Sequence, residues 1–247
     1  IDKIMDIMQY PFPHLKRTAQ ARRSVGVGIT NLAWALAEQG LRYDSPEGKR
    51  YIHELAEIHS YSLHKASVQL AKEKGKCEWI NKTKYAEGWL PIDTYCKEVD
   101  KVVESSLRCD WESLRREILE HGVRFSVLEA YMPVESSSVV SNTTNSLYPI
   151  REPVLIKTDG NNKNVFIAPD YEMLKDNYQM AWDVPYKDMI DVYAIVQKFT
   201  GQTISADTWR SFKEGEQPRL SAKELAERWM YRIKMGLKTH LTSWAKS

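Results

Sequence analysis

The sequence of 247 residues has few cysteines, no long apolar run and no excess of either charge. Cys77, Cys96 and Cys109 are too widely spaced for a Cys-x-x-Cys pair or a zinc site, so we expect reduced thiols. The 35 Lys and Arg nearly balance the 33 Asp and Glu, and a net charge of +2 points to neither a nucleic-acid nor a membrane partner. No apolar stretch approaches the roughly 20 residues of a membrane span, and the N-terminus lacks a signal-peptide pattern. We therefore expect a cytoplasmic protein.

The composition, 43% hydrophobic and 28% charged, is that of a folded chain with a real core. Neither an internal repeat nor a low-complexity linker is visible, so we expect one compact unit. Start and stop residues predict helices over 31–39, 46–74, 111–121, 171–182, 186–200 and 221–235, strands over 124–132 and 202–206, and a hairpin with strands 155–157 and 164–167. Long helices separated by short strands favour an α/β fold.

The longest predicted helix, 46–74, has apolar residues at three- to five-residue spacing. Its expected buried stripe consists of Tyr51, Leu55, Ile58, Leu63, Ala66 and Leu70. The histidines of this helix do not have the i, i+4 spacing of a helical metal site, so we expect them on solvated faces. Cys109 and His121 do not form a nucleophile–base pair, because the intervening helix would hold them roughly 18 Å apart.

Two motifs suggest phosphate chemistry. Gly26-x-Gly28 precedes a predicted helix, but Asn31 stands where a dinucleotide fingerprint needs its third glycine, so a tight strand-to-helix connection is the better interpretation. After Pro133 the predicted strand runs into a serine-rich turn. If a helix begins there, its first N–H groups and the hydroxyls of Ser136 and Ser137 converge on a site suited to phosphate. An ordinary serine-capped helix is the alternative.

The segments Trp111-Glu112-Ser113-Leu114, Gly122-Val123-Arg124, Ala130-Tyr131-Met132-Pro133, Glu135-Ser136-Ser137 and Ser141-Asn142-x-Thr144-Asn145 resemble, in order, the C-terminal half of the class I ribonucleotide reductase large subunit. Further matching segments are Arg22-Arg23-Ser24-x-Gly26-x-Gly28, Leu63-x-Lys65-Ala66-Ser67, Leu90-Pro91-Ile92-Asp93-Thr94-Tyr95, Pro169-Asp170-Tyr171, Gln197-Lys198-Phe199 and Ile204-Ser205-Ala206. The resemblance covers nearly the whole chain.

The resemblance implies a ten-stranded α/β barrel of two antiparallel halves, with this chain forming the second half and its surrounding long helices as one partial barrel domain over residues 1–247. It implies reduction of ribonucleoside diphosphates to deoxyribonucleotides by a cysteine radical. The implied partners are a cysteine-bearing N-terminal half of the large subunit and a radical-generating small subunit, which holds the family's metal and radical. No catalytic residue and no cofactor site is implied for this chain itself.

In the family, a Pro-x-Glu-Ser/Thr-Ser turn binds the substrate diphosphate. This role carries over by resemblance to Pro133, Val134, Glu135, Ser136 and Ser137, although the family usually has Ser at position 134.

The family also usually has Asn and Ser where this chain has Phe125 and Glu129. Alternation places these two side chains on one strand face with Val127 and Tyr131. If that face points into the barrel, the Glu129 carboxylate would repel a diphosphate by a few kcal/mol at low effective dielectric.

The family ends with paired tyrosines that relay the radical, and Leu241 and Thr242 stand at these positions. Neither side chain carries a one-electron hole. The family's C-terminal cysteine tail also has no counterpart before Ser247.

Three hypotheses follow. The chain is one piece of a split or truncated reductase large subunit, or a reductase-derived protein that has lost catalysis and binds a nucleotide or a partner, or an unrelated phosphate-binding α/β domain.

Overall fold

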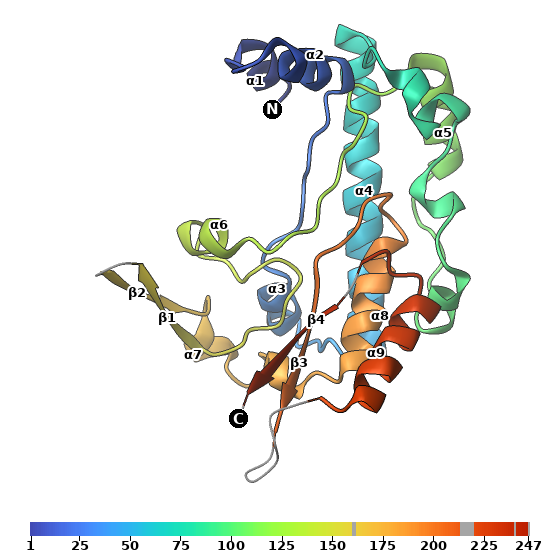
Figure 1. Cartoon of the computed structure of the whole chain (residues 1–247). Helices are drawn as coiled ribbons and strands as arrows, with labels where there is room; N and C mark the ends of the chain where they lie inside the picture. Colours follow the sequence, from blue (N-terminus) through green and yellow to red (C-terminus); the bar gives the residue numbers. More distant parts are fainter. Residues whose placement is uncertain (160–161, 213–219, 240, 247) are drawn as a thin grey trace.

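The computed structural model describes residues 1–159, 162–212, 220–239 and 241–246 (Figure 1). Its α-helices are α1 (Asp2–Ile7), α2 (Pro13–Arg22), α3 (Leu32–Glu38), α4 (Pro46–Lys74), α5 (Trp111–His121), α6 (Glu135–Val140), α7 (Tyr171–Leu174), α8 (Tyr186–Gln197) and α9 (Ala222–Lys234). Short 3-10 helices are η1 (Ile80–Lys82), η2 (Lys84–Glu87), η3 (Pro91–Asp93), η4 (Lys97–Lys101) and η5 (Ala181–Asp183). The strands are β1 (Val154–Asp159), β2 (Asn162–Ile167), β3 (Ala206–Ser211) and β4 (Leu241–Lys246).

Local capping signals set the ends of several helices. The Ser45 hydroxyl accepts a hydrogen bond from the Gly48 N–H at 3.0 Å at the start of α4, and Gly75 ends that helix. Asp110 caps α5 in the same way, with 2.9 Å to the Ser113 N–H. Ser221 and Glu224 form a capping box at the start of α9, where the sequence predicts a helix to begin.

One predicted helix was too long, and one helix was not predicted. The segment predicted as one helix over 171–182 is α-helical only in the four residues of α7, and the 3-10 helix η5 begins near its end. Beyond it, Gln179 bonds the Tyr43 N–H, and Met180 forms a parallel bridge with Ile150, so the chain bonds other segments in place of its own backbone. Helix α2 has no counterpart among the helices predicted from the sequence. Pro13 occupies the first turn of α2, where its missing N–H costs no hydrogen bond.

Extended segments from distant parts of the chain run parallel beside α4 (Figure 1). Val27 bridges Glu129, Tyr131 bridges Ile204, and β3 pairs with β4 with Trp209 opposite Trp244. The parallel order is therefore 25–28, 127–131, 204–211 and 241–246. Strands β1 and β2 form a separate antiparallel hairpin, as predicted, although residues 160 and 161 of its turn lie outside the described part.

The predicted α/β class is confirmed, but the described residues form no closed ten-stranded barrel. Their parallel segments are joined by isolated bridges and by the two-stranded sheet of β3 and β4, and this arrangement is open.

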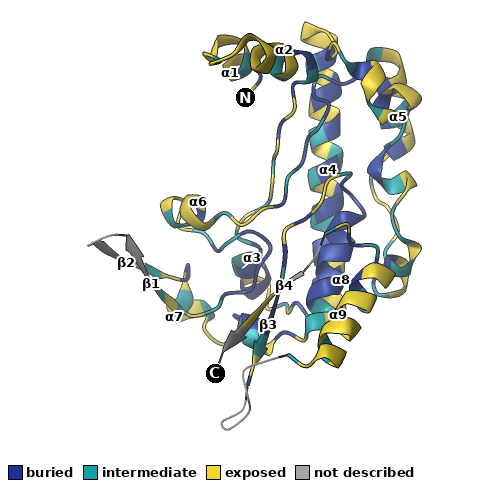
Figure 2. Ribbon diagram, viewed as in Figure 1, coloured by how far each residue is buried: buried dark blue, intermediate teal, exposed yellow. Residues whose placement is uncertain are grey.

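The main core lies where α8 packs against α4, β3 and α9. Figure 2 shows α8 buried along nearly its whole length, and every residue from Met189 to Gln197 is buried. Its apolar residues Ile190, Val192, Ile195 and Val196 all belong to the core. A helix that is apolar on all sides is expected to be surrounded by other elements.

The predicted buried stripe of α4 was wrong. Ile58 is 51% exposed, whereas the fully buried face carries His53, Glu57 and His64. Buried polar groups on a helix need partners, and the fold supplies several of them. For example, His64 bonds the Tyr85 hydroxyl through Nε2 at 2.9 Å. The expectation that the histidines of α4 lie on solvated faces was therefore wrong, since His53 and His64 are fully buried.

Candidate diphosphate-binding site

The serine-rich turn (residues 133–137) follows the segment 127–131 and leads into α6. Asn145 fixes its position from outside the turn. The Asn145 Oδ1 atom accepts a hydrogen bond from the Val134 N–H at 2.7 Å, and its Nδ2 donates to the Glu135 carboxylate at 3.0 Å. Sequence reasoning included Asn145 in a matching segment but gave it no role.

Helix α6 begins at Glu135, and its first internal hydrogen bond runs from the Ser138 N–H to the Val134 carbonyl at 2.8 Å. The N–H groups of residues 135, 136 and 137 therefore have no carbonyl partner within the helix. Val134 occupies the N-cap position, and no side chain caps the helix, so the alternative of an ordinary serine-capped helix is wrong. The hydroxyls of Ser136 and Ser137 are exposed and donate to no group in the described residues.

A hollow of about 200 Å³ lies on one side of the turn, and we call it the glycine-side pocket. It is lined by Gly26, Gly28, Ile29, Thr30, Ala130, Met132, Val134, Ser137 and Ser141. A Cβ atom on Gly28 would lie 2.5 Å from the Ala130 carbonyl oxygen, so only glycine permits this approach of the two strands. The predicted strand-to-helix connection at these glycines is confirmed, since α3 follows.

Asn31 stands where a dinucleotide fingerprint would have its third glycine, and in the structure it holds the loop that contains Thr144. Its N–H donates to the Thr144 carbonyl at 3.0 Å, and its Oδ1 accepts from the Thr144 N–H at 2.9 Å. This reciprocal pair ties the start of α3 to the segment that carries Asn145.

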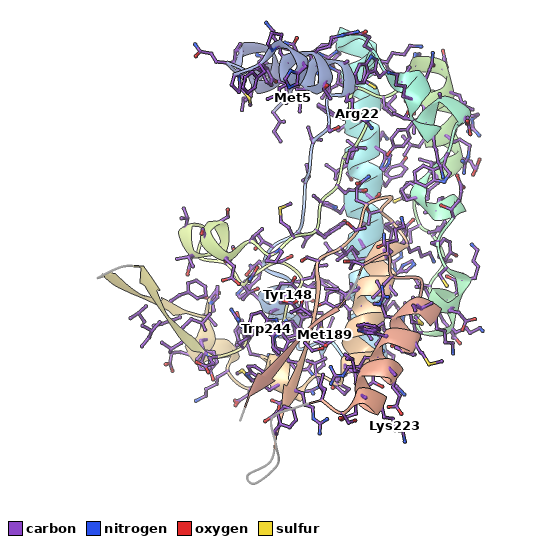
Figure 3. All side chains as sticks on the ribbon, viewed as in Figure 1. Met5, Arg22, Tyr148, Met189, Lys223 and Trp244 are labelled. Atoms are coloured by element: carbon purple, nitrogen blue, oxygen red, sulfur yellow. The ribbon has the colours of Figure 1, made fainter. Side chains whose placement is uncertain are left out.

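A larger pocket of about 290 Å³, the aromatic pocket, lies on the other side of the turn. It is lined by Pro133, Glu135, Ser138, Val139, Thr144, Asn145, Tyr148, Pro149, Ile150, Arg151, Glu152, Leu155, Phe166, Ala168, Asp207, Trp209 and Trp244. Figure 3 shows Tyr148 and Trp244 close together where β4 approaches this region. Burial raises the pKa of Asp207 above its ordinary value.

Comparison with known proteins identifies the family. The family model described as the ribonucleotide reductase barrel domain matches residues 1–176 and 168–243. The chain belongs to the ribonucleotide reductase family. This membership overturns the hypothesis of an unrelated phosphate-binding domain.

The chain is similar to alpha subunits of ribonucleoside-diphosphate reductases. It is 43% identical to that of Haemophilus influenzae over 240 residues, which are 97% of this chain and 32% of the relative. It is 42% identical to the reductase 1 alpha subunit of Salmonella typhimurium and 41% identical to that of Escherichia coli, each over 95% of this chain and 31% of the relative. The chain thus spans about a third of the length of these reductase subunits.

The five residues matched to the family's diphosphate turn do not all face one cavity. Val134 and Ser137 line the glycine-side pocket, Pro133 and Glu135 line the aromatic pocket, and Ser136 lines neither of them. The side chain of Val134 brings no hydroxyl, and its N–H is already bonded by Asn145.

The face that carries Phe125, Glu129 and Tyr131, which could have pointed into the barrel, does not line the glycine-side pocket. Phe125 and Tyr131 contact α4: the Phe125 N–H donates to the Ser67 hydroxyl at 3.1 Å, and the Tyr131 hydroxyl lies 3.0 Å from His59 Nδ1. Glu129 shares this face and is buried, and together with burial it raises the pKa of Tyr131. Ala130 and Met132, which alternate with this face, line the glycine-side pocket. The expected repulsion between the Glu129 carboxylate and a bound diphosphate therefore does not follow.

Leu241 and Thr242, which the resemblance matches to the family's relay tyrosines, lie at the start of β4. Leu241 pairs with Ala206 and Thr242 with Asp207 in the parallel register. The backbone of this region therefore lies beside a residue that lines the aromatic pocket.

Within the described ranges, no three His, Cys, Asp or Glu side chains are placed to hold a metal ion. The three cysteines are free thiols. No helix in the part of the chain that the structure describes is both long and apolar enough to span a membrane.

Proposed function

We propose that this chain is the diphosphate-binding part of a ribonucleoside-diphosphate reductase large subunit, with the substrate diphosphate held at the serine-rich turn. One observation carries the proposal. Three backbone N–H groups without helical partners and two exposed hydroxyls occur together just after the extended segment 127–131, which forms parallel bridges to two other segments. The C-terminal ends of parallel strands are where α/β sheets bind their ligands.

The donors and charges of the turn suit a phosphate. The N–H groups of residues 135–137 point out of the first turn of α6, and the Ser136 and Ser137 hydroxyls add two donors. Val134 contributes no donor. The Glu135 carboxylate is held away by the Asn145 amide and lies 3.5 Å from the Arg151 guanidinium, so its negative charge is partly balanced outside the glycine-side pocket.

The remaining parts of the reductase follow from the family resemblance. The open parallel sheet corresponds to one half of the ten-stranded barrel, and a cysteine-bearing half would cover its free edge. Strand edges that are long and exposed need such a cover. The partners are therefore the cysteine-bearing N-terminal half of the large subunit, the radical-generating small subunit and a ribonucleoside diphosphate.

Reconstitution tests this proposal. The chain alone should reduce no ribonucleoside diphosphate. Mixing it with a cysteine-bearing half and a small subunit should restore deoxyribonucleotide formation, measured by chromatography of the products. A mixture that lacks this chain is the control. A complete mixture that forms a stable complex and still yields no product contradicts the catalytic part of the proposal.

A second candidate function is a non-catalytic reductase relative that binds a nucleotide or a partner protein. Leu241 and Thr242 favour it, because neither side chain transfers an electron as a tyrosine does. An inert reconstituted mixture whose chain still binds a ribonucleoside diphosphate supports this candidate over the first.

A further inference from the structure

Arg151 lies between the serine-rich turn and the strand β4. Its Nη2 atom is 3.5 Å from Oε1 of Glu135, the first residue of α6. Its guanidinium carbon lies 5.6 Å from the centroid of the Trp244 ring on β4, which is within the range of a cation–π contact. One side chain therefore contacts two segments that are distant in the sequence.

The backbone of Arg151 is held by the body of the protein. Its carbonyl accepts a hydrogen bond from the Trp182 indole at 2.9 Å, and the carbonyl of Ile150 accepts one from the Ala181 N–H at 2.8 Å. The position of the guanidinium depends on the groups at the end of the side chain, because a third of that side chain is exposed to solvent.

The guanidinium is the one cationic group among the described residues that line the aromatic pocket, whereas Glu135, Glu152 and Asp207 each bring a carboxylate. The N–H of Glu135 is one of the three backbone donors at the start of α6. A carboxylate on that residue repels an anionic ligand, and the guanidinium of Arg151 offsets this charge. The position of Arg151 therefore sets the electrostatic potential beside the serine-rich turn.

Trp244 contacts the guanidinium from the side of β4. The parallel register of β3 and β4 places Trp244 opposite the buried Trp209, which fixes the backbone at this point. Tryptophan is the side chain whose ring attracts a cation most strongly. The indole of Trp244 is 44% exposed, so packing in the core does not account for the presence of this large ring.

We propose that Arg151 and Trp244 are positioning residues for the diphosphate. Trp244 holds the guanidinium of Arg151 beside Glu135, and β4 thereby raises the affinity of the serine-rich turn for a ribonucleoside diphosphate. This inference rests on the proposed function of the turn, and it adds a residue on a different strand that acts on the site only through Arg151.

A double-mutant cycle tests the inference, with calorimetric titration of the intact protein that carries this chain and cytidine diphosphate as the probe. Arg151→Gln should weaken binding about fivefold, because Glu135 loses its counter-charge, and Trp244→Leu should weaken it about threefold. In the Arg151→Gln protein, Trp244→Leu should have no further effect, since no guanidinium is left for the ring to hold. Trp244→Phe keeps an aromatic face and should bind nearly as tightly as the parent.

The effect of Arg151→Gln should also shrink at high ionic strength, because it is electrostatic, whereas a purely structural loss would remain. This comparison does not need Trp244→Leu and stays decisive if that variant does not fold. Arg17→Gln on α2 and Trp229→Leu on α9 are the matched controls, since they remove the same charge from an exposed site and an equally exposed indole. Both should bind cytidine diphosphate like the parent.

Two kinds of failure are distinguishable. An unchanged affinity of Trp244→Leu, the same loss from Trp244→Leu with and without Arg151, or a loss in Arg151→Gln that salt does not reduce overturns this inference and leaves the proposed function intact. A parent protein that does not bind cytidine diphosphate, or that binds it equally well after Ser136→Ala/Ser137→Ala, overturns the proposed function and this inference together.

Discussion

Asn145 and Val134 are joined by a 2.7 Å hydrogen bond from the backbone N–H to the side-chain Oδ1, across eleven positions of the chain. The same amide also bonds Glu135. The serine-rich turn is therefore positioned by a residue that lies beyond α6 and not by a cap of its own.

Replacing Asn145 by alanine should loosen this turn. The Val134 N–H would lose its acceptor, which should lower the free energy of unfolding by about 1 kcal/mol, and the affinity for a ribonucleoside diphosphate should fall with it. Urea unfolding and calorimetric titration measure the two effects. Asn81→Ala, at an exposed position of η1, is the control. An Asn145→Ala protein with unchanged affinity would show that the hydrogen bonds of Asn145 do not position the groups that bind the diphosphate.

Glu57 is a second internal anchor, at which one carboxylate oxygen serves three donors. Oε1 accepts from the N–H groups of Arg108 and Cys109, both at 2.9 Å, and from the indole of Trp111 at 3.1 Å. Glu57→Ala should lower the free energy of unfolding by about 3 kcal/mol, because three donors, among them the buried indole of Trp111, lose their acceptor. Glu57→Gln retains an oxygen and should lose less.

Urea denaturation of both variants checks this prediction, with Glu73→Ala at an exposed position of the same helix as the control. Equal losses for Glu57→Ala and Glu73→Ala would refute the assigned role of the Glu57 carboxylate.

The sequence was sufficient to predict where α4 begins and ends, because Ser45, Pro46 and Gly75 are local signals. It was not sufficient to predict which face is buried. Glu57 and His64 are buried at low cost only because Trp111, Tyr85 and other partners distant in the sequence meet them, and these partners are known only once the chain is folded.

The candidate site also has some features that the sequence predicts and others that depend on the folded structure. The proline and serines of the turn are visible in the sequence, whereas the bonds made by Asn145 and Asn31 depend on tertiary contacts. Alternation correctly grouped Phe125, Glu129 and Tyr131 on one strand face, but it does not say whether that face points to a helix or to a cavity. The position of α4 decides this.

His53 should make the stability of the protein depend on pH between about 6.5 and 4. Burial, with a smaller effect of Lys198, lowers the pKa of His53 to about 4. In this range the unfolded chain binds a proton that the folded chain excludes, so stability falls as the pH falls. The total effect is about 3 kcal/mol.

Urea unfolding midpoints measured from pH 7 to pH 4 test this dependence. His53→Leu, at a site packed against Phe199, should flatten the profile, and His14→Gln at an exposed position should not. A profile for His53→Leu as steep as that of the parent would assign the pH dependence to other groups.

Asp2 joins the N-terminal helix to the rest of the fold through three cations. It forms ion pairs with Arg23 at 2.6 Å, Arg124 at 2.8 Å and Lys74 at 3.0 Å. Burial acts to raise the pKa of Asp2, but hydrogen bonds from Arg124, Lys74 and Arg23 lower it well below its ordinary value. Its stabilising effect is therefore present above the unfolded pKa of about 3.9 and is lost as the pH falls below it.

Asp2→Asn should lower the free energy of unfolding at pH 7 by about 3 kcal/mol, because the buried guanidinium of Arg23 and the half-buried guanidinium of Arg124 lose a counter-ion. Thermal unfolding followed by circular dichroism measures the loss, with the exposed Asp176→Asn as the control. A stability equal to that of the control would mean that this ion cluster contributes nothing.

The binding of a ribonucleoside diphosphate to the serine-rich turn is measured most directly by calorimetric titration of the parent and of Ser136→Ala/Ser137→Ala with each of the four common ribonucleoside diphosphates. The double variant should bind more weakly by about 1–3 kcal/mol, because two hydroxyl donors to the phosphates are removed. Ser62→Ala/Ser106→Ala, at two exposed positions away from the turn, should bind like the parent. An affinity of the Ser136→Ala/Ser137→Ala protein equal to that of the parent would contradict the placement of the diphosphate at residues 133–137.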